Sequence, residues 1–247
     1  ADYLSERRQA VSIDRVNSDF EANGHGVPQG SVIGPFLFNV YVRNLFKTME
    51  DAGFTIHGYA DDHQVLYEFE LDFQVAAIRS VIPHGLDIIS NWMNRHFLKL
   101  NPSKSQVIVF TPKAMSDQIV FERMMLSDGS YIPISQEVLS LGVKFDGQLT
   151  FSPQVTSLLS QGYHLIRNVA SISKYLSRDH LKALVNSIVI AKVDNCNSVL
   201  YGISAYDSGR LQKFQNSCAR LIYGKRKFDH VSGLLHWLPA EALISRY

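Results

Sequence analysis

The chain has 247 residues, of which 46% are hydrophobic and 19% charged, so it can bury a substantial core and lacks the composition of a disordered protein. Its two cysteines cannot build a disulfide framework, and no apolar run approaches the roughly 20 residues that a membrane span needs. With no basic-then-apolar leader at its start, we expect an intracellular protein of the nucleus or cytoplasm that has no membrane partner.

The net charge of +1 hides two oppositely charged regions. Residues 163–247 carry 12 Lys and Arg against 5 Asp and Glu, whereas residues 1–162 carry a net charge of −6. An acidic part followed by a basic part suits a protein that holds metal ions in one place and a phosphate backbone in another. Basic residues that merely solvate helix surfaces are the plain alternative.

The first half of the chain alternates between strand and helix signals. Alternating apolar positions predict a strand within residues 4–16, and a Gly- and Pro-rich stretch then leads into a helix over residues 36–49. β-branched and aromatic residues on both sides of an Ala-Asp-Asp turn predict a hairpin over residues 54–67. A helix over residues 73–97 follows, which we expect Pro83 to kink or break.

Two more strands are predicted at residues 106–110 and 138–143, after which the pattern changes. Apolar residues then recur at helical spacing in three segments, over residues 155–169, 181–189 and 211–222. We therefore expect an α+β fold with two regions. Residues 1–150 form the mixed region, and residues 151–247 form a mainly helical one.

Asp61 and Asp62 are neighbouring carboxylates at the predicted hairpin turn, where they repel each other unless a cation joins them. Hard oxygen ligands of this kind suit Mg²⁺ or Mn²⁺. A pair of such ions can activate an attacking 3′-hydroxyl and stabilise a departing pyrophosphate. Taken alone, an Asp-Asp dipeptide is more simply an exposed turn.

The segments around this turn form an ordered series of motifs. They are Gly-Val-Pro-Gln-Gly-Ser at residues 26–31, Tyr-Ala-Asp-Asp at 59–62, Leu-Lys-Leu-Asn-Pro-Ser-Lys at 98–104 and Leu-Ser-Leu-Gly-Val at 139–143. In this order they resemble the motifs of reverse transcriptases from non-LTR, LINE-type retrotransposons of the jockey-like kind. The resemblance runs over nearly the whole chain, and the ordered series is far more specific than any one motif.

The resemblance implies a partial polymerase palm over residues 1–150, an antiparallel sheet with packed helices, and a helical thumb-like region over residues 151–247. The implied activity is RNA-directed DNA synthesis, in which two metal ions (Mg²⁺ or Mn²⁺) assist nucleotidyl transfer from a dNTP to the 3′-hydroxyl of a DNA primer on an RNA template. The family also has a metal-binding aspartate motif upstream of residues 26–31. That motif is not found here, so we expect a fragment.

The resemblance also assigns roles to single residues. Asp61 and Asp62 are the implied metal ligands, and Lys104 is implied to approach the triphosphate. Without the ordered motifs, Lys104 would be interpreted as an ordinary solvated lysine after a turn. The implied nucleotide- and template-binding residues are Gln29, Gly30, Tyr59 and Ala60. The implied primer grip is Leu141, Gly142 and Val143. The candidate contacts to the nucleic-acid backbone are Lys174, Arg178, Lys182, Lys213, Arg220, Lys225, Arg226 and Lys227.

A function of another class stays open, namely a nucleic-acid-binding remnant or domesticated fragment without catalysis. It keeps the basic thumb and a hairpin that no longer does chemistry. Because a third carboxylate is missing, we expect the chain alone to polymerise poorly. We assign structural roles to His57, His63, Trp92, Trp237, Cys196 and Cys218, the cysteines as small buried hydrophobes.

Overall fold

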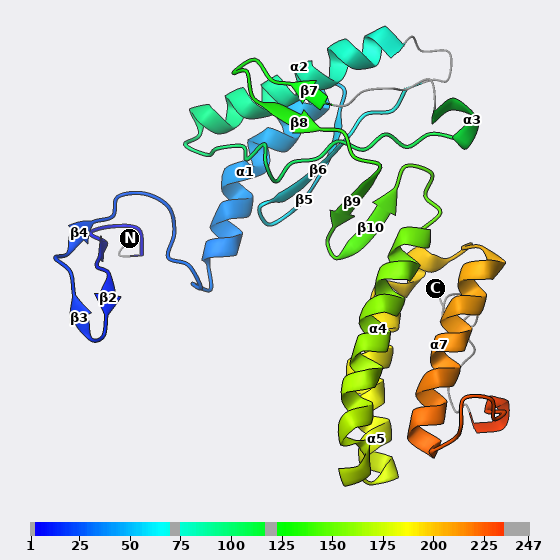
Figure 1. Ribbon diagram of the computed structural model, residues 1–247. Coiled ribbons are helices and arrows are strands. Elements are labelled where there is room, and N and C mark those ends of the chain that lie inside the picture. The colour runs from blue at the N-terminus through cyan, green and yellow to red at the C-terminus, as the bar shows by residue number, and fades with distance from the viewer. Residues whose placement is uncertain (1–2, 70–74, 117–122, 235–247) are drawn as a thin grey trace. The chain divides into compact units, whose positions relative to one another are not determined.

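The computed structural model describes residues 3–69, 75–116 and 123–234, and the chain divides into two compact units, Ala1–Leu100 and Asn101–Tyr247 (Figure 1). Helices predominate, and every sheet among the described residues is antiparallel with two strands, so the predicted α+β class is confirmed. No helix in these ranges has the length and apolar character needed to cross a bilayer. The assignment of residues 1–150 to a palm and 151–247 to a thumb stays a prediction.

The first unit begins with a narrow antiparallel ribbon whose strand residues are all exposed. In it β1 (Arg8–Gln9) pairs with β4 (Glu21–Ala22), and β2 (Ser12–Ile13) pairs with β3 (Val16–Asn17). The two residues of its turn both have positive φ, the conformation that matches the twist of paired strands. The strand predicted within residues 4–16 therefore occurs as short pieces of this ribbon.

The core of the first unit lies between two helices and one hairpin, all three of which the sequence predicts. These elements are α1 (Gly34–Asp51), β5 (Thr55–Tyr59), β6 (Asp62–Leu66) and α2 (Val75–Arg95). The buried side chains are those of Val42, Leu45, Met49, Phe54, Ile56, Ile89, Trp92 and Met93, which confirms Trp92 as a core residue. The helix α2 continues through Pro83, which rules out a break at this residue, while the alternative of a kink stays a prediction.

The second unit opens with short strands. β7 (Arg123–Met125) pairs with β8 (Tyr131–Pro133), and the strand predicted at residues 106–110 is reduced to a single bridge between Val107 and Ile134. A one-turn helix, α3 (Lys113–Ser116), also falls in this part.

The single strand predicted at residues 138–143 is instead a hairpin. β9 (Glu137–Ser140) pairs with β10 (Val143–Asp146), and Ser140 lies opposite Val143. Leu141 and Gly142 form the turn with φ of 49° and 84°. Two consecutive positive φ angles give the kind of two-residue turn that lets strands twist together. The prediction was wrong here because leucine at positive φ carries no turn signal.

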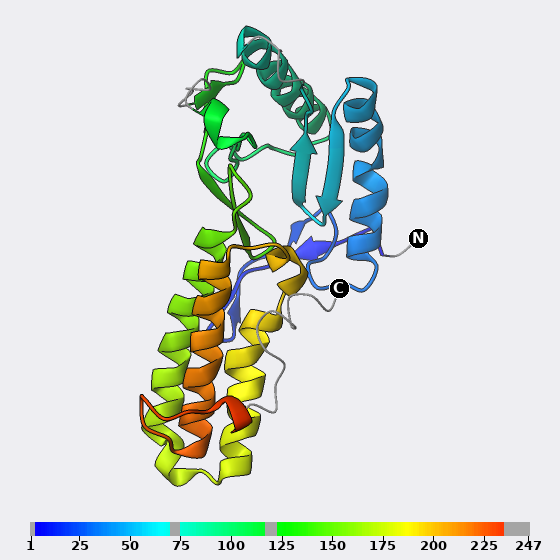
Figure 2. The same ribbon diagram turned by 90° about the vertical axis from the view of Figure 1, so that its right-hand side faces the viewer.

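The rest of the second unit is a bundle of helices (Figures 1 and 2). In chain order it contains α4 (Ser152–Ile172), η1 (Ser173–Tyr175), α5 (Arg178–Leu184), the π-helical η2 (Val185–Ile190), α6 (Ala191–Asp194), η3 (Asn197–Leu200), α7 (Ala205–Tyr223) and η4 (Ser232–Leu234). These helices confirm the three helical segments predicted after residue 151.

The helices α4 and α7 lie side by side and approach closely at one glycine. A Cβ placed on Gly162 would lie 2.4 Å from the ring of the fully buried Phe214, so only glycine leaves room for this contact. The neighbouring Cys218 is completely buried, and its burial raises the pKa of its thiol to about 12. Cys196 is exposed, which corrects the prediction that both cysteines are buried.

Candidate functional site

The Tyr-Ala-Asp-Asp motif forms the tip of the β5–β6 hairpin, as the sequence predicts. Tyr59 pairs with Asp62, which leaves Ala60 and Asp61 as the two residues of the turn. Ala60 has a φ of 55°, a region that L-residues seldom occupy and that clusters at functional sites. The hairpin therefore places both carboxylates at the end of a tight turn, where Asp61 and Asp62 are exposed.

The two faces of this hairpin differ sharply in burial. Side chains that pair across the strands lie on the same face, and those of Thr55, His57, Tyr59, Asp62, Gln64 and Leu66 share one face and are all exposed. The opposite face carries the buried Ile56 and the half-buried Val65, which pack into the core with α1. Asp62 and Tyr59 thus occupy the open face, while the other face fixes the hairpin to the helix.

Gly58 allows the hairpin to lie close against α1. A Cβ at this position would lie 2.6 Å from Cζ of Phe46, a half-buried residue of that helix. The edge of the Phe46 ring also meets the His63 ring at 5.9 Å between centroids. His63 is half-buried and His57 is exposed, in agreement with the structural roles predicted for both.

Neither carboxylate of the tip has a hydrogen-bond or ion-pair partner in the part of the chain that the structure describes. The backbone carbonyl of Asp61 is 3.1 Å from Nδ1 of His63, but the Asp61 side chain takes no part in this contact. Among the described residues no group of three or more His, Cys, Asp or Glu side chains could hold a metal ion. The hairpin therefore contributes two free carboxylates, which are fewer ligands than a metal site built from protein side chains alone would need.

The Pro28-Gln29-Gly30 segment lies in an exposed loop just before α1. Gly30 has a φ of 79°, and the Ser31 amide donates to the Pro28 carbonyl at 3.2 Å, which turns the chain into the helix. Gln29 and Gly30 are both exposed, as a nucleotide- or template-binding role requires. Their contact with nucleic acid stays a prediction.

A cavity of about 260 Å³ lies between α1 and the hairpin tip. It is lined by Asn39, Val42, Arg43, Phe46, Gly58 and Ala60. Asn39 and Arg43 are one helical turn apart, so they present an amide and a guanidinium on the side of α1 that faces the turn. Neither residue was singled out from the sequence.

Lys104 belongs to the second unit and follows a compact turn. The Asn101 side chain accepts hydrogen bonds from the Ser103 amide at 3.2 Å and the Ser103 hydroxyl at 2.7 Å, and the Lys104 amide donates to the Asn101 carbonyl at 3.1 Å. This arrangement leaves the Lys104 side chain exposed. Its approach to a triphosphate stays a prediction.

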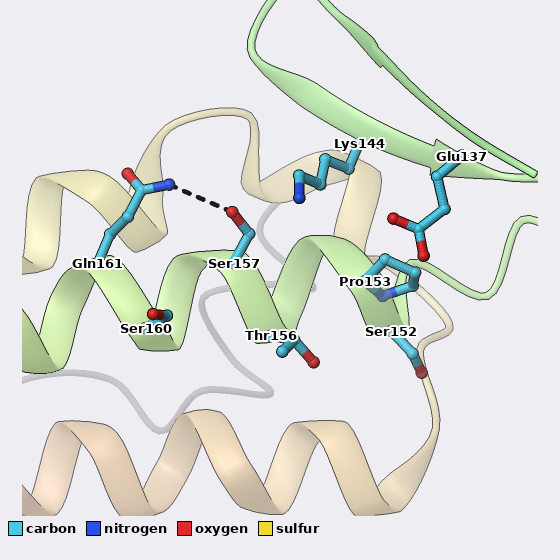
Figure 3. A pocket seen from close by; sticks show the side chains of 8 residues that line it. All are labelled: Glu137, Lys144, Ser152, Pro153, Thr156, Ser157, Ser160 and Gln161. Atoms are coloured by element: carbon cyan, nitrogen blue, oxygen red, sulfur yellow. Dashed lines mark hydrogen bonds between the residues drawn. The ribbon is translucent and has the colours of Figure 1, made fainter. Parts of the chain in front are cut away.

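The predicted primer grip is the turn of the β9–β10 hairpin, with Leu141 and Gly142 exposed and Val143 buried. This hairpin is fixed to α4 because the Lys144 amide donates to the buried Gln154 side chain at 2.9 Å. A cavity of about 600 Å³ lies where β9 and β10 meet α4 (Figure 3). It is lined by Glu137, Lys144, Ser152, Pro153, Thr156, Ser157, Ser160 and Gln161.

Most residues that line this cavity have polar side chains, and the strand side contributes both the Lys144 ammonium and the Glu137 carboxylate. Figure 3 shows Lys144 on the strand above the exposed hydroxyl-bearing face of α4, where Gln161 donates to the Ser157 hydroxyl at 3.2 Å. Hydroxyl, amide and ammonium groups are the side chains that contact phosphate and sugar oxygens. The sequence did not indicate this cavity, because it joins residues of the β9–β10 hairpin with residues of α4 that belong to no motif.

A buried carboxylate ties the start of α4 to the start of α7. Asp207 is 1% exposed and accepts hydrogen bonds from the Ser152 and Ser204 hydroxyls and, at 2.8 Å, from the Arg210 guanidinium. Burial alone would raise the pKa of Asp207, but the hydrogen bonds from Ser152, Arg210 and Ser204 and the Arg210 charge outweigh it, so this pKa is lowered. Arg210 also donates to Thr156 at 3.1 Å. The network thus holds two residues that line the Lys144 cavity.

The predicted backbone-binding cations differ in their surroundings. Arg220 donates two hydrogen bonds to the Asp229 carbonyl, Lys213 lies in the middle of α7, and Lys182 is half-buried on α5. The other five lie at one end of the bundle, where α4 and α7 end and α5 begins (Figures 1 and 2). They are Lys174, Arg178, Lys225, Arg226 and Lys227. Two exposed aromatic residues beside them, Tyr175 and Phe228, were not predicted.

Comparisons with known proteins identify the family. Residues 2–145 match the family described as reverse transcriptase (RNA-dependent DNA polymerase). The chain is 31% identical over 234 residues to the probable RNA-directed DNA polymerase from transposon X-element of Drosophila melanogaster, which covers 90% of this chain and 24% of that protein. It is 27% identical over 231 residues to the corresponding probable polymerase from transposon BS of the same species, covering 89% and 24%.

A third relative is the RNA-directed DNA polymerase from the mobile element jockey of Drosophila melanogaster, 27% identical over 209 residues, or 83% of this chain and 22% of that protein. The chain therefore spans about a quarter of the length of these relatives. No solved structure matches it. The family match and these relatives show that the chain belongs to the reverse transcriptases of jockey-like, non-LTR retrotransposons.

Proposed function

We propose that this chain supplies the metal-binding hairpin, the primer grip and the thumb of an RNA-directed DNA polymerase. The reaction is nucleotidyl transfer from a dNTP to the 3′-hydroxyl of a DNA primer that is paired with an RNA template. The observation that carries the proposal is the tip of the β5–β6 hairpin. It holds Asp61 and Asp62 side by side, exposed and without partners in the part of the chain that the structure describes.

The donor set of the tip fits a hard divalent cation. Asp61 and Asp62 offer carboxylate oxygens that no hydrogen bond within the described residues occupies, and Mg²⁺ typically takes one or two protein carboxylates together with substrate phosphates. Such ions, when bound, activate the attacking hydroxyl and stabilise charge on the phosphoryl and leaving-group oxygens. In the proposal Asp61 is the principal ligand and Asp62 supports it.

Other residues of the chain position the substrates. Tyr59 lies on the same open face as Asp62, where its exposed ring can support the primer end, and Ala60 keeps the turn small enough for a nucleotide to approach. Gln29 and Gly30 border the nucleotide and template, and the Lys104 ammonium neutralises the departing pyrophosphate. These roles come from the motif positions, and the exposure of all five residues supports them.

The primer strand has a suitable binding surface beside the β9–β10 turn. We propose that its sugar–phosphate backbone enters the cavity of about 600 Å³ next to Leu141, Gly142 and Val143. There the Lys144 ammonium neutralises a phosphate, and the α4 hydroxyl groups of Thr156 and Ser157 donate to backbone oxygens. The Asp207 network keeps α4 in place under this surface.

The proposal is tested in a chimera, because the chain matches only part of its relatives. The chain replaces the matching segment of the jockey polymerase, and extension of an oligo(dT) primer on poly(rA) is measured with Mg²⁺ or Mn²⁺. We expect extension that Asp61→Asn lowers at least about a hundredfold, as expected when a group that stabilises the transition state is removed. Asp62→Asn should also lower it.

The matched control is Asp51→Asn, which removes an exposed carboxylate at the end of α1 and should leave extension unchanged. Extension that survives Asp61→Asn would show that the hairpin does not bind the catalytic metal. A chimera that binds primer–template without extending it would favour the remnant without catalysis. The 247-residue chain alone should extend poorly, because its described residues offer no third carboxylate near the tip.

A further inference from the structure

The end of the helical bundle where α7 stops combines exposed aromatic rings with cations. Tyr175 of η1 is 77% exposed and Phe228, just beyond α7, is 85% exposed. Each ring has a lysine over it: Nζ of Lys174 lies 4.9 Å from the Tyr175 ring centre, and Nζ of Lys227 lies 5.5 Å from that of Phe228. We call the surface formed by residues 174–178 and 225–228 the bundle-end patch.

The two segments of the bundle-end patch are held together by contacts within the fold. The Arg178 guanidinium lies 5.7 Å from the ring centre of Tyr223, the last residue of α7. Figures 1 and 2 both show the end of α7 beside the start of α5. The patch is therefore one surface assembled from residues about 50 positions apart in the chain.

The segment that carries Phe228 is also fixed in shape. The guanidinium of Arg220 donates to the Asp229 carbonyl at 3.1 Å, and the Asp229 carboxylate accepts from the Arg226 amide at 2.8 Å. These bonds close a turn over residues 226–229. Phe228 is thus held in the open by a structured turn, which reduces the entropy lost when a ligand stacks on it.

The charge of the patch is strongly positive. Its five cations are Lys174, Arg178, Lys225, Arg226 and Lys227. None of them is ion-paired with a carboxylate in the ranges that the structure describes. A cluster of unpaired cations attracts phosphates. Exposed rings add the one contact that a duplex cannot use, since paired bases are already stacked on each other.

We propose that the bundle-end patch binds single-stranded nucleic acid, with Tyr175 and Phe228 stacking on unpaired bases and the five cations neutralising the flanking phosphates. In the polymerase proposed above, the unpaired part of an RNA template is a strand of this kind. The inference does not depend on catalysis, because the patch contains no residue of the hairpin tip or of the primer grip.

The test measures binding of the 247-residue chain to labelled oligonucleotides by fluorescence anisotropy. The ligands are oligo(U), oligo(dT) and an RNA duplex of matched length, all in the same salt. For the double variant Tyr175→Ala/Phe228→Ala we expect the Kd for single strands to rise at least about tenfold, because each base–aromatic stack contributes substantially to binding. The Kd for the duplex should change less than about twofold, since its phosphate contacts remain.

Tyr201→Ala is the matched control. Tyr201 is 75% exposed, like Tyr175, but no cation of the described residues lies over its ring. This variant should bind all ligands as the parent chain does. The exchanged pair Tyr175→Phe/Phe228→Tyr should also bind normally, because either ring can stack. Circular dichroism verifies that each variant folds, and the single variants Tyr175→Ala and Phe228→Ala serve if the double variant does not.

Selective weakening of single-strand binding, whether of RNA or DNA, supports the proposal. An equal loss on the duplex, or a loss no larger than that of Tyr201→Ala, overturns it. Lys227→Gln separates charge from stacking: it should weaken single strands and duplex alike and reduce the salt dependence of both.

Discussion

Removal of the Asp207 carboxylate should destabilise the second unit more than any change of an exposed acid in it. Asp207 is the third residue of α7, and Ser204 at the N-cap accepts from its amide at 3.1 Å. Its side chain also reaches Ser152 at the start of α4. Asp207→Ala therefore removes the side-chain link between the two helices, while the cap that Ser204 forms on the amide of residue 207 remains.

The magnitude follows from the bonds that are lost. The two hydrogen bonds from Ser152 and Ser204 contribute roughly 1 kcal/mol each, and the charged one from Arg210 contributes roughly 1.5–3 kcal/mol. Arg210 keeps its bond to Thr156 and is 26% exposed, so water can solvate part of its charge after the change. We therefore expect a loss of about 3–4 kcal/mol, near the lower end of values for broken buried ion pairs.

Urea unfolding followed by circular dichroism gives the free energy, and hydrogen exchange of peptides from α4 and α7 shows where protection is lost. Asp179→Ala is the control, because Asp179 is also in the first turn of a helix, α5, but is exposed. Asp179→Ala should lower the free energy of unfolding by no more than about 1 kcal/mol, because only the interaction of this carboxylate with the helix dipole is lost. Equal losses for the two variants would show that the buried network contributes nothing beyond the dipole.

Three further predictions concern the same bundle. Because the pKa of Asp207 is lowered in the folded protein, its contribution to stability is complete above about pH 4 and is lost as the pH falls through the folded value; Asp207→Asn should flatten the acid limb of the unfolding curve. Gly162→Ala should lower stability by about 1–2 kcal/mol because its Cβ meets Phe214, whereas Gly209→Ala, with open space around it in α7, should raise stability by about 0.5–1 kcal/mol in urea titrations. Gln215→Leu should raise stability by about 1–2 kcal/mol, since this side chain is 1% exposed and both its polar atoms lack partners among the described residues; a lower midpoint in urea would reveal a partner for the amide.

Elements with a local signal were predictable, whereas contacts between distant residues were not. The β5–β6 hairpin follows from strand formers around a polar turn, and its bounds at Thr55 and Leu66 lie close to the predicted range. The β9–β10 turn has no such signal at Leu141, so two strands were predicted as one. Ser204 and Asp207 do carry the spacing of a capping box. Their partner Ser152, however, lies 55 residues before Asp207, and no sequence pattern connects them.

The predicted site residues divide in the same way. Asp61 and Asp62 come together because they are adjacent in sequence, and the hairpin needs no distant contact to present them. The eight predicted thumb cations were chosen by charge alone, and charge does not tell which side chains the fold occupies. The Arg220 guanidinium donates a hydrogen bond to the Asp229 carbonyl, whereas the Lys227 ammonium lies over the exposed ring of Phe228. Exposed aromatic residues are equally hard to predict, since such side chains are usually at least partly buried.

The two proposed sites respond to different physical variables, so they can be tested independently. In the proposal the hairpin tip acts through a divalent cation, so primer extension should be lost with Asp61→Asn without any change in single-strand binding. The bundle-end patch depends on stacking and on phosphate charge, so its binding should weaken with added salt and persist without Mg²⁺. A chain that has lost polymerisation can therefore still hold an RNA strand. Because a catalytically silent remnant and an active polymerase share this second property, they are separated by primer extension and by its loss with Asp61→Asn.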